Sequence, residues 1–151
     1  SAAAAPEVAY MFKVTATTSY GEDTYKDLDT NQNFYWTLQG PAGSSCASET
    51  KYFTLEALIN AVNSLDGAAG DDGLRYEPGK LPESFYGSVG GNATWTIGWV
   101  WEFESNVHTY DHDNNPDTPA LNQDQFDTYM GNKLNLDELQ ITISIEATQI
   151  N

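Results

Sequence analysis

The sequence predicts a mainly β fold, a jelly-roll-like antiparallel sandwich with one or two short helices. Three segments alternate apolar and polar side chains with the two-residue period of a strand that buries one face. These segments lie at residues 8–16, 92–103 and 139–148. Long connections between them, without a regular strand–helix–strand rhythm, favour an antiparallel sandwich over a parallel sheet.

The first predicted strand covers residues 8–16. One face of it carries the larger apolar side chains, which are Val8, Tyr10, Phe12 and Val14. Residues 33–38 predict a second, shorter strand, and Gly40-Pro41 ends it. We therefore expect two strands before the first helix.

Residues 54–65 have the features of an amphipathic helix. Thr54 is a suitable N-cap, and Glu56 places a negative charge in the first turn. Apolar residues follow at helical spacing, namely Leu55, Leu58, Ile59, Val62 and Leu65. Asp66-Gly67 provides a C-terminal stop. We expect the apolar stripe to cover one face or end of the sandwich.

The tryptophan-rich segment at residues 92–103 is the most distinctive strand. One face carries Ala93, Trp95, Ile97, Trp99, Trp101 and Phe103. Buried aromatic side chains contribute much apolar area, so we expect this strand at the centre of the core. A short strand near residues 74–76, a helical turn at 123–130 and the last strand at 139–148 complete the prediction.

Length and charge limit the classes of function. A chain of 151 residues is expected to form one sandwich domain, which we place at residues 17–151. A net charge of −16 argues against nucleic-acid binding and against docking on anionic lipids. It fits a surface protein, a cation-binding surface or adaptation to high salt. The single cysteine, Cys46, has no partner for an intrachain disulfide.

The first residues resemble a mature end left by a signal peptidase. The chain opens Ser1-Ala2-Ala3-Ala4-Ala5-Pro6, and it contains no apolar run of the ~18 residues that span a membrane. We therefore expect a protein that is secreted, extracellular or attached to the cell surface, with no membrane insertion.

No strong catalytic signature is present, and we do not expect an enzyme. His108 and His112 are four residues apart, but Thr109 stands where a zinc protease has its glutamate, and Asn and Pro residues nearby disfavour a helix. We expect no cofactor to be required.

The acidic loop at residues 111–117 is a candidate calcium site. Its oxygen ligands would be Asp111, Asp113, Asn115 and Asp117. An EF-hand loop is excluded, because Pro116 and Asn122 occupy the positions of its glycine and glutamate. The alternatives are a looser calcium site and a solvated acidic loop.

Two other features concern sugars. Asn92-Ala93-Thr94 is a sequon, so Asn92 is a candidate glycosylation site in a host that glycosylates. Glu102 and Glu104 lie two residues apart on the outward face of the aromatic strand, a combination that also suggests a secreted carbohydrate-binding β-sandwich module. Such a module is the alternative to the function considered next.

Several segments together resemble the TasA/camelysin family of exported biofilm-matrix fibre subunits, which has archaeal relatives that form bundling pili. These segments are the tryptophan strand at 95–103, Asp117-Thr118, the terminal strand at 141–149 and the helix start at 54–58. The resemblance covers roughly residues 50–151. It implies a structural, homopolymeric subunit that partners with itself and that bundles laterally with other filaments.

The resemblance also implies assembly by donor-strand complementation, in which a terminal strand of one subunit fills a groove in the next. Residues 1–16 would be the donor segment, and Val8, Tyr10, Phe12 and Val14 would fill the pockets. Added strands bind through backbone hydrogen bonds and through alternate side chains that fix the register. The alternative is that residues 8–16 pair within their own subunit.

Overall fold

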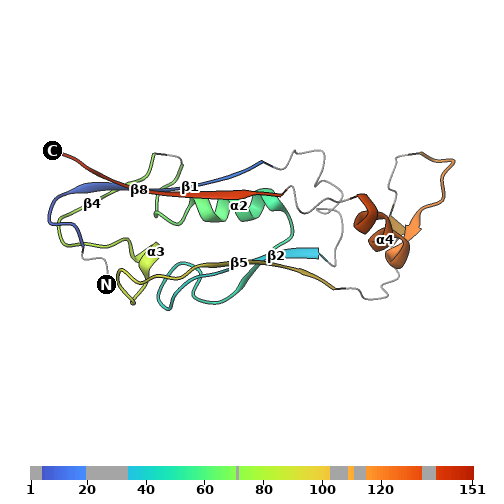
Figure 1. Ribbon diagram of the computed structural model, residues 1–151, viewed down its shortest axis with the longest axis horizontal. Helices are drawn as coiled ribbons and strands as arrows, with labels where there is room; N and C mark the ends of the chain where they lie inside the picture. Colours follow the sequence, from blue (N-terminus) through green and yellow to red (C-terminus); the bar gives the residue numbers. More distant parts are fainter. Residues whose placement is uncertain (1–4, 20–33, 71, 103–108, 111–114, 134–138) are drawn as a thin grey trace.

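The computed structural model describes residues 5–19, 34–70, 72–102, 109–110, 115–133 and 139–151. Within these residues the fold is mainly β, with two three-stranded antiparallel sheets that face each other (Figure 1). This arrangement confirms the predicted mainly β class and is consistent with a sandwich.

The first sheet has the order β4-β1-β8 and the second has the order β3-β2-β5. The strands of the first sheet are β1 (Tyr10–Thr18), β4 (Leu74–Tyr76) and β8 (Ile141–Gln149). Those of the second are β2 (Phe34–Gln39), β3 (Thr50–Tyr52) and β5 (Thr96–Trp101). The central strands are thus β1 and β2.

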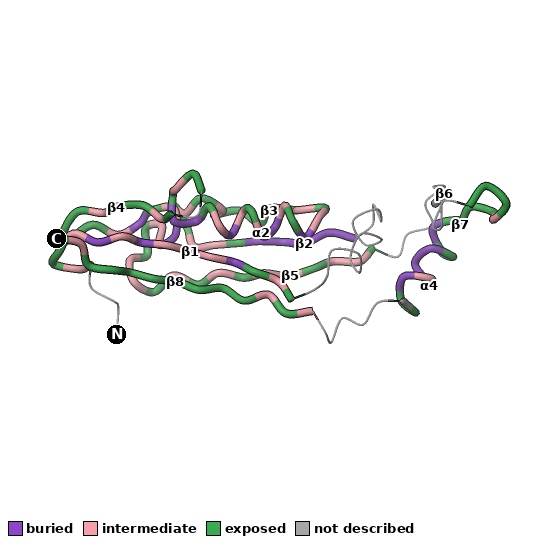
Figure 2. The backbone as a smooth tube through the Cα atoms, turned by 90° about the horizontal axis from the view of Figure 1, so that it is seen from above, coloured by how far each residue is buried: buried purple, intermediate pink, exposed green. Residues whose placement is uncertain are grey.

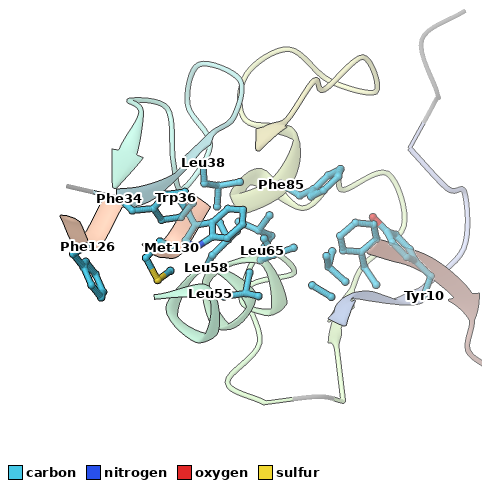
Figure 3. Close-up of a cluster of buried hydrophobic side chains, with 14 residues drawn as sticks. Tyr10, Phe34, Trp36, Leu38, Leu55, Leu58, Leu65, Phe85, Phe126 and Met130 are labelled. Atoms are coloured by element: carbon cyan, nitrogen blue, oxygen red, sulfur yellow. The ribbon is translucent and has the colours of Figure 1, made fainter. Parts of the chain in front are cut away.

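The two long sides of the sandwich differ. Helix α2 (Leu55–Asn63) lies on the side of β3 and β4, whereas β5 and β8 run along the opposite side (Figure 2). The buried face of α2 carries Leu55, Leu58 and Val62, which pack among side chains of β1 and β2 (Figure 3). One side of the core is therefore closed by a helix.

Helix α2 forms where the sequence predicts it. The Thr54 side chain accepts a hydrogen bond from the backbone N–H of Ala57 at 3.1 Å, which confirms the expected N-cap. The helix ends at Asn63, earlier than predicted, because the Ser64 N–H turns back to the carbonyls of Ala61 and Val62. Leu65 follows the helix but stays in the core, with 4% of its surface exposed.

The tryptophan strand differs from the prediction in length and in place. Strand β5 is an edge strand that pairs with β2 alone among the described residues, not the centre of the core. As a result Trp99 is 53% exposed. Alternation in the sequence predicts which side chains of a strand face the other sheet. It does not predict whether that strand has one neighbouring strand or two.

The remaining elements are α3 (Glu83–Tyr86), the strand pair β6 (Thr109–Tyr110) and β7 (Leu121–Asn122), and α4 (Gln123–Lys133). Helix α4 starts with reciprocal hydrogen bonds between Asn122 and Gln125, the pattern of a capping box. It extends beyond the turn that was predicted to end at residue 130. Its buried residues Phe126 and Met130 join the hydrophobic core (Figure 3).

Candidate strand-exchange site

Strand β1 occupies a slot between two other strands of its own sheet. All nine of its residues pair with β8, from Tyr10 opposite Gln149 to Thr18 opposite Ile141. On its other side β4 pairs only with residues 10–12. The second half of β1 therefore needs different partners on that side.

Where β4 stops, the side chains of Asn63, the last residue of α2, and of Asp66, three residues further on, take over. The backbone N–H of Val14 donates to Oδ2 of Asp66 at 3.1 Å, and that of Ala16 donates to Oδ1 of Asn63 at 2.5 Å. Asp66 is fully buried, and its Oδ1 accepts a second hydrogen bond from the Ala68 N–H at 2.8 Å. These bonds satisfy buried backbone donors that would otherwise be costly to leave unpaired.

The sequence interpretation did not find these two residues. Asp66 was assigned only to the helix stop. The sequence shows only a carboxylate directly after the apolar helical stripe that ends at Leu65, and this pattern does not reveal which backbone groups it accepts from.

Three of the four predicted pocket-filling residues are buried in the slot. Tyr10, Phe12 and Val14 are 3%, 2% and 3% exposed. The Phe12 ring lies 5.5 Å from the ring of Phe85 and 6.0 Å from that of Tyr86, measured between centroids. The pocket around Phe12 is therefore largely aromatic.

Val8, the fourth predicted pocket-filling residue, is not buried, and Ala16 extends the buried face instead. Val8 lies before the strand and is 42% exposed, whereas Ala16 is 3% exposed and continues the buried face of β1. The reason is register: the paired part of β1 begins at Tyr10, so the buried face starts one alternation later than predicted.

The Tyr10 hydroxyl anchors the start of the strand. It donates to the carbonyl oxygen of Lys80 at 2.6 Å, and its ring stacks on that of Tyr76 with centroids 5.8 Å apart. Burial raises the pKa of Tyr10 above 10.0, and the neighbouring Tyr76 and Tyr86 add to the rise. The neutral hydroxyl is the form that fits the slot.

In the single chain, β1 is thus paired with its own β4 and β8. This is the in-chain arrangement that the sequence analysis set against donation to a second molecule. Strand β1 also runs to Thr18, two residues past the boundary expected at residue 16. Donation of residues 8–16 stays a prediction about an assembled state.

Among the residues that the structure describes, no segment covers the side of the sandwich opposite α2. A groove of about 350 Å³ lies there, lined by apolar residues that include Trp95, Ile97, Ile143 and Ile145. Ile143 is 42% and Ile145 is 50% exposed. Among the described strands, neither β5 nor β8 has a second neighbour. Both strands run along this side of the sandwich (Figure 2), and residues of β5 and β8 line the groove.

The predicted calcium ligands are only partly described. His108, Asp111, His112 and Asp113 lie outside the described residues. Asn115 and Asp117 are exposed, and Oδ1 of Asn115 accepts a hydrogen bond from the Asp117 N–H at 3.1 Å. Within the part of the chain that the structure covers, no three His, Cys, Asp or Glu side chains gather as metal ligands would. A calcium site remains a prediction.

Two single residues complete the sequence-derived candidates. Asn92 is exposed in the segment just before β5, an accessible position for a glycan. Cys46 is half-buried and unbridged, with its Sγ 3.9 Å from the Tyr52 hydroxyl. Glycosylation of Asn92 stays a prediction.

Two of the tryptophans on β5 and just before it are already engaged inside the protein. Nε1 of Trp95 donates to the Phe85 carbonyl oxygen at 2.9 Å, and Nε1 of Trp101 donates to the Asp127 carboxylate at 2.8 Å. Trp99 is the residue of the three that exposes more than half of its surface. A flat aromatic platform for sugars would need more than one ring turned outward.

Comparisons of this chain with protein-family models, with curated proteins and with solved structures find no match. Over the described residues, no helix has the length and apolar character needed to cross a membrane.

Proposed function

We propose that this protein is a structural subunit of a secreted, extracellular filament, such as a pilus or a biofilm-matrix fibre. Subunits assemble head to tail by donor-strand complementation, with β1 of one copy occupying the β1 slot of the next. The completed subunit would be a jelly-roll-like sandwich that contains one strand from its neighbour. The protein has no enzymatic activity in this proposal and partners with itself.

The observation that carries the proposal is the nature of the β1 slot. It binds β1 through backbone pairing with β8 and through Asn63 and Asp66, and it buries Tyr10, Phe12 and Val14. None of these interactions depends on whether the strand comes from the same chain or from another. Exchange of identical elements therefore conserves the contacts, which makes it a low-cost route to assembly.

The segment that connects β1 to β2 is long enough to allow such an exchange. Residues 19–33 join β1 to β2 in the sequence. At ~3.3 Å per residue, a stretch of this length reaches about 50 Å when fully extended, which exceeds the length of a nine-residue strand.

A reversible lock on β1 tests the proposal. Met11 and Thr148 are paired residues on the outer face of β1 and β8. Facing residues in an antiparallel pair have Cα atoms about 4.5–5.5 Å apart, within the range that a disulfide spans. We would combine Met11→Cys and Thr148→Cys with Cys46→Ser, so that the new bridge forms without competition.

The expected result is that the oxidised protein stays unpolymerised and that reduction restores filaments in electron micrographs. The Cys46→Ser protein without the lock is the control, and it should polymerise with or without reductant. Filaments of normal length from the oxidised, locked protein would rule out donation of β1. Failure of the control to polymerise under every condition tried would reject the filament function itself.

The carbohydrate-binding alternative has less support from the geometry, since Trp95 and Trp101 are hydrogen-bonded within the protein. Its remaining support is the exposed ring of Trp99. Titration of glycans against tryptophan fluorescence tests it: a shift in emission that the Trp99→Ala variant loses would favour sugar binding over assembly.

A further inference from the structure

We infer that strand β8 pairs with β8 of a second copy, antiparallel and about a two-fold axis, along the open side of the sandwich. This contact is separate from the exchange of β1. It joins the two β4-β1-β8 sheets edge to edge and brings the two apolar grooves together. The occupant of the groove side is therefore a second copy of this chain.

The first observation is the direction of the backbone groups of β8. Ser19 N–H donates to the Gln140 carbonyl oxygen and Ile150 N–H donates to the Ala9 carbonyl oxygen, both at 3.1 Å. The N–H and C=O of one strand residue point to the same side, and this side alternates along the strand. Even-numbered residues of β8 therefore bond to β1, and odd-numbered residues present their N–H and C=O groups to the open side.

The second observation is that, within the described part of the chain, this edge lacks the usual protection. Edge strands of soluble proteins commonly carry lysine, proline, bulges or a covering segment that prevents pairing. Strand β8 is nine residues long with the sequence ITISIEATQ, and Glu146 is its only charged residue. Its odd-numbered residues Ile143 and Ile145 are also 42% and 50% exposed. The edge has the character of a pairing surface.

The third observation concerns charge. Two copies that each carry −16 repel each other, so a stable contact needs a surface with few acidic groups. Strand β8 offers one acidic side chain and β5, with the sequence TIGWVW, offers none. A side with so few acidic groups repels a second copy less than an acidic side of the same molecule would.

One register satisfies these constraints best. With the two-fold axis at Ser144, Ile143 of each copy lies opposite Ile145 of the other, and Glu146 lies opposite Thr142. Odd-numbered residues then face odd-numbered residues, as hydrogen bonding across the open edge requires. The register forms two isoleucine pairs and no pair of like charges, and cross-strand pairs of this kind stabilise a sheet.

The self-association of the oxidised, locked protein tests the contact apart from β1 donation. Sedimentation velocity at about 0.5 M salt, where charge repulsion is screened within ~4–5 Å, should show a monomer–dimer equilibrium. Ile145→Lys should raise the dimer dissociation constant at least about a hundredfold, because the symmetric contact buries the new charge twice. The control Val89→Lys changes charge at a site of similar exposure (45%) and should stay within about threefold.

Disulfide crosslinking tests the register of the β8–β8 contact in protein without the Met11→Cys and Thr148→Cys lock. Ser144→Cys with Cys46→Ser should yield a covalent dimer on mild oxidation, since facing residues at a non-hydrogen-bonded position have Cα atoms about 4.5 Å apart. Thr142→Cys with Cys46→Ser is the matched control on the same face of the same strand, and it should remain largely uncrosslinked.

Three results would overturn the inference. The first is a locked protein that stays monomeric up to about 1 mM, the limit of a very weak contact. Equal effects of Ile145→Lys and Val89→Lys would place the contact elsewhere. Equal crosslinking of the two cysteine variants would remove the two-fold register. If only the unlocked protein associates, the open side binds a donated strand and not β8 of a second copy, and strand donation survives while this inference fails.

Discussion

Replacing Phe12 by alanine tests whether the β1 slot holds the fold together. Phe12 is 2% exposed, and its ring meets Tyr76, Phe85 and Tyr86 with centroids 6.4, 5.5 and 6.0 Å away. Truncation of a buried phenylalanine typically costs about 3–5 kcal/mol, because apolar burial is lost and a cavity remains. Domains of this size have total stabilities of about 5–15 kcal/mol. The variant should therefore lose a large fraction of its stability.

The matched control is Val8→Ala, at the position that the alternation pattern groups with Phe12 but that the structure leaves 42% exposed. This substitution should change the free energy of unfolding by less than about 0.5 kcal/mol. The free energy of unfolding of each variant would be measured by urea denaturation of the locked, oxidised protein, with tryptophan fluorescence as the signal. Losses of similar size for the two variants, or a loss below about 1 kcal/mol for Phe12→Ala, would refute the assignment of the buried face.

Three further predictions follow from the slot and from the charge. Asp66→Asn keeps the shape of the side chain but leaves one of the two backbone donors, Val14 N–H or Ala68 N–H, without an acceptor. The substitution should lower the free energy of unfolding by about 1.5–3 kcal/mol and speed amide exchange at Val14 or Ala68. Unchanged exchange at both residues would contradict the assignment. Because the pKa of Tyr10 is raised, its contribution to stability is complete below pH 10 and is lost as the pH rises through the folded-state pKa. In thermal unfolding, Tyr10→Phe should therefore lose less stability at alkaline pH than the unsubstituted protein. An identical loss of stability in both proteins would count against this role of Tyr10. Added salt or Ca²⁺ should favour assembly of a chain with a net charge of −16, measured by light scattering; faster assembly in low-salt chelator buffer would argue the opposite.

The locations of the main elements follow from local patterns. Alternation located β1 and β8 to within about two residues, and helical spacing with Thr54 as N-cap located α2. These patterns are readable because each depends on side chains that are close in sequence. Helix α4 was predicted too short, since the predicted turn ended at residue 130, just before Gly131, and the structure continues to Lys133. A glycine inside a helix costs only about 1 kcal/mol, which packing of the helix offsets.

The candidate site was predictable only in part. The buried roles of Tyr10, Phe12 and Val14 follow from alternation along β1, but the exposure of Val8 depends on where pairing with β8 begins. The acceptor roles of Asn63 and Asp66 were not predictable, because they depend on β4 ending opposite Phe12 and on α2 ending beside β1.

By itself the sequence determined that the chain is mainly β, that Tyr10, Phe12 and Val14 face inward on the first strand, and that the chain is strongly acidic. The tertiary structure alone decided which strands are central and which are edges, and hence that β1 is enclosed while β5 and β8 border an open apolar groove. The physical reason is that side-chain alternation is a local property of one strand. Strand neighbours are set by backbone hydrogen bonds between segments far apart in the chain, such as Tyr10 with Gln149, and nearly any sequence can make those bonds.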